Sequence, residues 1–149
     1  MNQRLPEGVV LQPRREIRDA RGSVLHMLRA DAPEFSTFGE VYFSEILPGV
    51  VKAWKRHRQQ TQRLIVPVGR VEFVIADDRP ESPTYGLITR LTLGRPDDYN
   101  LLVIPPGLWY GWRALGETPA LIANCADRPH DSAESELAAE PGALGPYTW

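Results

Sequence analysis

Short apolar segments alternate with turns along most of the chain. The segments are rich in Val, Ile, Leu, Phe, Tyr and Trp, and 14 prolines and 12 glycines punctuate them. This pattern predicts β-strands at residues 23–28, 40–47, 50–54, 63–68, 70–76, 87–93, 100–104, 110–115 and 120–126. Many short strands with such turns are typical of an all-β sandwich or barrel, and 149 residues suit a single domain over 1–149.

Three features depart from simple alternation. The acidic segment HDSAESELAAE at 130–140 predicts a short helix near the C-terminus. Pro67 lies inside a predicted strand, and because proline has no N–H to donate, we expect it at a sheet edge or a bulge. The segment RVEFVIA at 70–76 is apolar on both faces, which predicts the opposite sheet on one face and a second subunit on the other. We therefore expect a homodimer.

Charge is balanced overall but uneven along the chain. Lys and Arg number 17 against 19 Asp and Glu, giving a formal net charge of −2, which argues against general nucleic-acid binding. Basic residues gather in 52–70 and acidic residues in 127–140. A local basic patch on a nearly neutral protein suits a small anionic ligand.

Cysteine usage and hydropathy indicate a cytoplasmic protein. The single cysteine, Cys125, lies in the apolar stretch LIANCA, so we expect a buried free thiol in a reducing compartment. The first residues have no long apolar core, and no apolar run approaches membrane-spanning length, so we expect no membrane partner.

The first half of the chain has the spacing of a cupin metal motif without its ligands. That motif is a glycine, five residues, His-x-His, three or four residues, Glu, six residues and Gly, and a hairpin brings its side chains to one face. Here the frame is Gly49, Lys55, His57, Gln62 and Gly69. An ammonium replaces one imidazole and an amide replaces the carboxylate.

The second cupin motif lacks its ligand too. It ends in Pro-x-Gly, two further residues and then a histidine, whereas PPGLWYGW has Pro105, Gly107 and then Tyr110 in the place of the histidine. One histidine, a lysine, an amide and a phenol make a poor site for a divalent cation. The spacing therefore predicts a cupin-type barrel with no bound metal, and we expect no cofactor. His57 is more simply explained as a hydrogen-bonded pocket or core residue.

Several blocks in order resemble the dTDP-4-dehydrorhamnose 3,5-epimerases. They are DARGSV at 19–24, FGEVYFSEILPGVVKAW at 38–54, DDRPESPTYG at 77–86, IPPGLWYGW at 104–112 and the terminal PYTW. The resemblance implies a jelly-roll cupin that dimerises by exchanging its N-terminal strands, a nucleotide-sugar ligand and no metal. It also implies epimerisation next to a ketone, in which a histidine held by an aspartate removes a proton, a lysine steadies the enolate and a tyrosine returns a proton.

The family's catalytic positions carry other residues here. The histidine position falls on Lys55, the lysine position on Gln62 and the tyrosine position on Ala123, while the acidic partner aligns loosely with Glu140. The expected binding frame remains. Arg21 is expected to meet the pyrophosphate, and Glu40, Tyr42 and Ser44 face the ligand from one strand.

These observations yield a candidate site. The catalytic candidates are Lys55, as a base or as a contact to an enolate or phosphate, His57 beside it, and Tyr110 as a replacement acid. The alternatives are a lysine that extends out of the barrel and an aromatic that only packs. The expected substrate contacts are Arg21, Glu40, Tyr42, Ser44, Lys52, Gln62, Arg63 and Asn124.

Two functions follow from this site. The first is a metal-independent epimerase or isomerase of a nucleotide-linked keto-deoxy sugar. The second is an inactive cupin that only binds a sugar nucleotide. A metal-dependent oxygenase is disfavoured because the ligands are missing.

Overall fold

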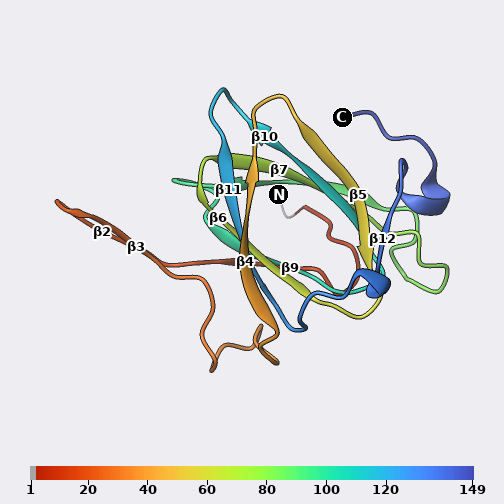
Figure 1. Cartoon of the computed structure of the whole chain (residues 1–149), viewed down its shortest axis with the longest axis horizontal. Helices are drawn as coiled ribbons and strands as arrows, with labels where there is room; N and C mark the ends of the chain where they lie inside the picture. The colour runs from red at the N-terminus through yellow and green to blue at the C-terminus, as the bar shows by residue number, and fades with distance from the viewer. Residues whose placement is uncertain (1–2) are drawn as a thin grey trace.

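Two antiparallel sheets stacked face to face form the body of the protein in a computed structural model that describes residues 3–149. One sheet has the order β1-β9-β6-β11-β4 and the other β12-β5-β10-β7-β8 (Figure 1). The strands are β1 Val10–Pro13, β2 Glu16–Asp19, β3 Gly22–Leu25, β4 Glu40–Ile46, β5 Val51–His57, β6 Gln62–Val68, β7 Arg70–Ala76, β8 Ile88–Gly94, β9 Asn100–Ile104, β10 Trp109–Leu115, β11 Ala120–Ala126 and β12 Ser135–Leu137. The all-β prediction is confirmed, but the sheets do not close into a barrel.

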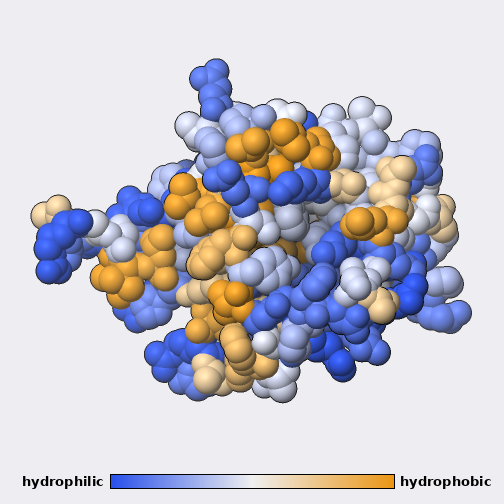
Figure 2. All heavy atoms as spheres, in the orientation of Figure 1, coloured by the Kyte–Doolittle hydropathy of each residue, from blue (hydrophilic) through white to orange (hydrophobic). Residues whose placement is uncertain are grey.

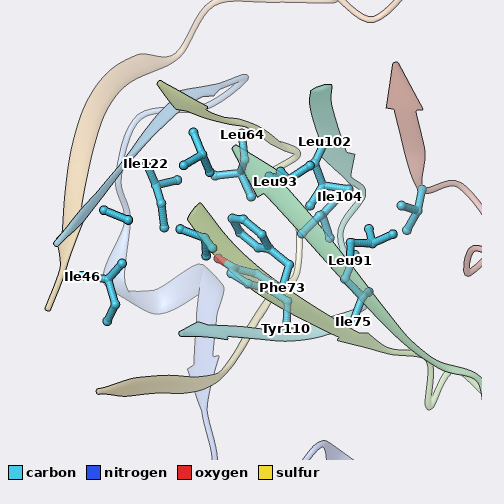
Figure 3. Close-up of a cluster of buried hydrophobic side chains, with 14 of the residues drawn as sticks. Ile46, Leu64, Phe73, Ile75, Leu91, Leu93, Leu102, Ile104, Tyr110 and Ile122 are labelled. Atoms are coloured by element: carbon cyan, nitrogen blue, oxygen red, sulfur yellow. The ribbon is translucent and has the colours of Figure 1, made fainter. Parts of the chain in front are cut away.

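The core lies between the two sheets because alternate residues of facing strands point inward. Val71, Phe73 and Ile75 of β7 are fully buried and pack with Leu102 and Ile104 of β9 in one cluster. Figure 3 shows these side chains meeting from opposite sheets, with the ring of Tyr110 beside Phe73. The aromatic ring of Tyr110 is therefore part of this hydrophobic core.

The outer face of β7 is covered by the same chain. Val74 and Ala76 pack with Trp54 and Trp109, and the C-terminal residues Ala138, Leu144, Tyr147 and Trp149 lie on this cluster. The expectation that a second subunit covers this face is therefore wrong. The two-sided apolar pattern arises because the C-terminal segment folds back onto the sheet.

The predicted helix at 130–140 does not form. Ser132–Glu134 make a single 3-10 turn, capped by the Asp131 side chain, and β12 follows at once and pairs with the edge of β5. Backbone hydrogen bonds between Trp54 and Ala138 extend this pairing. Edge pairing to β5 gives these backbone groups partners that an isolated acidic helix would have to find within itself.

One strand pairing in the first sheet is irregular, and one hairpin lies outside both large sheets. The pairing of β6 with β11 shifts by one residue between Ile65 and Val68, so the bulge expected at Pro67 is confirmed. Outside the sheets, β2 and β3 form a hairpin that projects from the body of the molecule (Figure 1). Within residues 3–149, no helix is long and apolar enough to cross a membrane.

Candidate functional site

A pocket of about 340 Å³ lies between the edge strand β4 of the first sheet and the β12-β5-β10 side of the second. Its walls come from β4 and β5, with β10 behind them and β12 at the rim. The lining residues are Tyr42, Ser44, Lys52, Ala53, Trp54, Lys55, Tyr110, Trp112 and Leu137. Five of the residues expected at the site, Tyr42, Ser44, Lys52, Lys55 and Tyr110, therefore meet at one cavity.

His57 lies directly behind the pocket wall and links two other polar groups. It is the last residue of β5 and is 4% exposed. Its Nε2 lies 3.0 Å from the hydroxyl of Tyr110, and its Nδ1 contacts the carboxylate of Glu134. The sequence placed His57 and Tyr110 together, but it did not predict Glu134.

Three backbone N–H groups hold the Glu134 carboxylate in place. The amides of Arg58, Gln59 and Gln60 donate to its Oε2 at 3.2, 3.0 and 3.2 Å. Oε1 remains for His57. The structure brings Glu134 to His57, whereas Glu140, the acidic partner expected from the resemblance, lies six residues further along the chain. No spacing signal marks Glu134, because its position depends on β12 joining the edge of β5.

Burial and charge set the protonation of this trio. Burial lowers the pKa of His57, and the carboxylate of Glu134 only partly offsets this effect. Burial also pushes the pKa of Glu134 upward, but the hydrogen bonds from His57 and the backbone outweigh it and hold the pKa below its usual range. The pKa of Tyr110 is raised well above its usual range, chiefly by burial.

These directions define one arrangement of protons at neutral pH. Glu134 is ionised, so His57 carries its proton on Nδ1 and donates it to that carboxylate. The free electron pair on His57 Nε2 then accepts the hydroxyl proton of Tyr110. The chain Glu134–His57–Tyr110 thus gives the hydroxyl proton of Tyr110 an acceptor, and the lowered pKa of His57 and the raised pKa of Tyr110 keep that proton on the phenol at rest.

Lys55 brings positive charge to the same wall. It stands opposite Tyr110 in the pairing of β5 with β10, is half-buried, and lines the pocket. It forms no salt bridge within residues 3–149. Lys52 lines the pocket too, but its Nζ donates to the backbone carbonyl of Glu45 at 3.0 Å. An unpaired ammonium beside the phenol suits a developing oxyanion.

The opposite wall carries Tyr42, and a chain of amides lies behind it. The Asn124 amide donates to the Tyr42 hydroxyl at 2.9 Å and also to the Gln62 side chain, which in turn donates to Gln60 at 2.9 Å. Asn124, Gln62 and Gln60 are each at most 3% exposed. Gln62 and Asn124, both expected to touch substrate, therefore support Tyr42 from behind the pocket.

Arg63 is directed away from the pocket. It is 1% exposed, and its guanidinium donates to the carbonyl of Glu34 at 2.7 Å and to the Ser36 hydroxyl. Neighbouring residues of a strand face opposite ways, so Gln62 and Arg63 cannot both face the pocket. The expected substrate contact of Arg63 is replaced by a structural one, which anchors the loop before β4.

Arg21 and Glu40 also lie outside this lining. Arg21 is at the turn of the projecting hairpin, exposed, and bound to Asp19 at 2.7 Å. A contact between Arg21 and the ligand would therefore require the pocket of another chain. Glu40 points to the inner side at the far end of β4, beyond Tyr42.

The tryptophans divide between the two sides of the sheet. Trp54 and Trp109 belong to the outer cluster under the C-terminal segment. Trp112 stacks on Tyr110 inside the pocket, and its buried Nε1 has no hydrogen-bond partner within residues 3–149. Across that range no three His, Cys, Asp or Glu side chains converge as metal ligands would.

Comparisons with known proteins agree on one family. The family described as dTDP-4-dehydrorhamnose 3,5-epimerase matches residues 2–145. A probable low-salt glycan biosynthesis epimerase, Agl13 of Haloferax volcanii, is 35% identical over 115 residues, which are 76% of this chain and 73% of the relative.

Solved structures give the same result. The dTDP sugar isomerase of Desulfovibrio desulfuricans is 54% identical, with a TM-score of 0.92 over 97% of this chain and 92% of that one. A dTDP-6-deoxy-D-glucose-3,5-epimerase of Legionella pneumophila, solved with dTDP-4-keto-L-rhamnose, is 22% identical with a TM-score of 0.77 over 87% of this chain and 71% of that one. The second likeness concerns the fold alone.

Proposed function

The chain belongs to the dTDP-4-dehydrorhamnose 3,5-epimerase family, and we propose that it epimerises or isomerises a nucleotide-linked keto-deoxy sugar by proton transfer. The observation that carries this proposal is the Glu134–His57–Tyr110 chain at the wall of the pocket. A pocket that only bound a sugar nucleotide would have no need of a buried, fully partnered relay. The family resemblance supports a reaction next to the ketone of the sugar.

Tyr110 and His57 remove the substrate proton, and Lys55 stabilises the enolate that results. A hydrogen on the carbon beside a ketone is acidic because its loss gives an enolate. Tyr110 passes its hydroxyl proton to His57 Nε2 and takes the substrate proton on its oxygen, and the resulting imidazolium is balanced by Glu134. Lys55 lies on the same wall to pair with the enolate oxygen. Reversal of these steps returns the proton.

The nucleotide end of the ligand is expected to involve a second copy of the chain. Relatives of this fold bind dTDP sugars, and we infer a nucleotide-sugar ligand here as well. Arg21 on the projecting hairpin is then the pyrophosphate contact of the partner's pocket, because it lies away from its own. We place this activity in the cytoplasm, where the buried thiol of Cys125 stays reduced.

Isotope exchange tests the proposed function. The purified protein would be incubated in D₂O with a panel of nucleotide-linked 4-keto-6-deoxy sugars, dTDP sugars among them, and the sugar protons followed by NMR. We expect deuterium to appear on a carbon next to the ketone. Chemical-shift changes on binding without exchange for any sugar in the panel would instead support the inactive binding cupin.

Glu134→Gln should alter both the rate and its pH dependence. Proton transfer needs neutral His57, so activity falls as the pH drops through the pKa of His57. The carboxylate of Glu134 raises that pKa, while burial, Lys55 and His130 lower it. The variant should therefore show an acid limb shifted to lower pH and a lower maximal rate, because the imidazolium loses its counter-charge. Its pH–rate profile for deuterium exchange measures both effects, and an unchanged acid limb would contradict the role of Glu134.

A charge on the outer face of β4 should break the proposed dimer. Val41 and Phe43 point outward from β4 and are 49% and 64% exposed, and Ile17 and Val24 of the hairpin are similarly exposed. Figure 2 shows apolar side chains gathered on this face. Because a buried unpaired carboxylate is costly, Phe43→Glu should sediment as a monomer in analytical ultracentrifugation. Tyr85→Glu, at an exposed aromatic elsewhere, is the control that should leave the wild-type mass unchanged.

A further inference from the structure

Inversion of a carbon needs a proton donor on the face opposite the base. The Glu134–His57–Tyr110 chain lies on the wall built by β5 and β10. On its own it can remove a proton and return it only to the side from which it came. If the proposed function is an epimerisation, a second donor must stand on the other wall, and this inference rests on that proposed function.

Tyr42 presents a hydroxyl from the facing sheet. It lies on β4, in the first sheet, and lines the same pocket as Tyr110 of the second sheet. Its neighbour on that wall, Ser44, is a far weaker acid than a phenol. Trp112, which lines the pocket from β10, has an indole N–H that is only a hydrogen-bond donor and does not act as an acid. Tyr42 is therefore the one lining residue of its wall with suitable chemistry.

The amide behind Tyr42 leaves its hydroxyl proton free. The backbone N–H of Arg63 donates to Asn124 Oδ1 at 3.1 Å, so the amide is oriented with its NH₂ group toward Tyr42. That NH₂ group donates to the Tyr42 oxygen at 2.9 Å and to the Gln62 side chain. Since the Tyr42 oxygen accepts this hydrogen bond, its own O–H can point into the pocket. A donated hydrogen bond also stabilises the tyrosinate that remains after the proton leaves.

We propose that Tyr42 is the proton donor for the second face of the sugar, and that Asn124 positions it. The enolate carbon takes the hydroxyl proton of Tyr42 as the enolate electron pair forms the new C–H bond, which leaves a tyrosinate. The substrate proton has meanwhile passed to Tyr110, whose own proton is on His57, so the site holds one imidazolium and one tyrosinate. Water entering the open pocket restores both groups. Reaction from the other epimer runs the same steps in reverse.

The protonation of Tyr42 agrees with a donor. Burial raises its pKa, and the hydrogen bond from Asn124 opposes that rise. The phenol therefore begins each cycle protonated at neutral pH.

Tyr42→Phe separates exchange from inversion. In D₂O the wild type should yield both deuterium next to the ketone and the inverted epimer, which the chemical shifts of the remaining sugar protons distinguish. In Tyr42→Phe, deuterium should still enter with retained configuration, while formation of the inverted epimer falls by about 10²-fold or more. Tyr85→Phe, the same change at an exposed tyrosine outside the pocket lining, is the matched control and should form the epimer within a few-fold of the wild-type rate. Binding of dTDP, followed by NMR titration, confirms that each variant is folded.

Other outcomes each give a definite answer. Epimer formation retained in Tyr42→Phe, or exchange and inversion lost together in a variant that still binds dTDP, would overturn the role of Tyr42. Wild-type exchange without any inversion would also overturn it, and would show an isomerase that works on one face. If the wild type exchanged no deuterium with any sugar, the result would instead contradict the proposed function itself.

Discussion

Tyr110→Phe is expected to slow deuterium exchange next to the ketone by about 10²- to 10⁴-fold, the usual contribution of a general acid–base group. The variant removes one oxygen and keeps the ring, which is 3% exposed and packs beside Phe73 and Trp112. Packing should therefore survive, while His57 loses its link to the substrate. NMR exchange rates at saturating nucleotide sugar measure the effect on chemistry.

A companion variant shows whether the loss comes from the relay. His57→Gln removes the group that receives the phenol proton, so it should lower the exchange rate to a similar extent. Because Tyr110 and His57 act as one unit, the double variant should be little slower than either single variant. Losses that multiplied in the double variant would show two independent roles and contradict the relay.

The strands could be predicted from the sequence because their signal is local. Period-two alternation and the turn residues locate β4 to β11 without knowledge of distant residues. Strands β1 and β2 were missed because each has only four residues and carries charges or proline. The motif spacing also predicts that Lys55, His57 and Tyr110 lie close together, because residues at fixed intervals along paired strands lie on the same face of the sheet.

Glu134 could not be found because its position is a tertiary effect. It belongs to an acidic segment whose composition favours a helix, and only the pairing of β12 with β5 brings it to His57. Arg63 was misplaced for a related reason. The spacing rule pointed to Gln62 and its neighbour, but both are buried, so hydropathy alone does not say which faces the pocket. Arg63 faces away from the pocket because its guanidinium donates to backbone carbonyls of the loop before β4.

The proposed mechanism gives Lys55 and His57 the roles that other residues are expected to hold in the family. At the position that the resemblance assigns to the family's histidine, Lys55 provides a positive charge in register with Tyr110. We propose that His57, two residues on and on the same face of β5, takes the proton. The proposed base thus lies two residues further along β5, and the proposed electrostatic partner lies on β5 instead of at the Gln62 position on β6. This arrangement explains how the site can lack the usual set and still contain each chemical role.

Lys55→Met is therefore expected to lower the exchange rate by about 10²- to 10³-fold, the usual cost of removing one oxyanion partner. Methionine keeps much of the side-chain volume, so the pocket stays filled while the charge is lost. Lys52→Met is the matched control, because Lys52 lines the same pocket from the same strand but directs its ammonium to the Glu45 carbonyl. If Lys55 acts on the enolate, its variant loses exchange rate at saturation, whereas a phosphate contact would weaken binding alone. Equal losses in both lysine variants would mean that only the overall positive charge of the pocket matters.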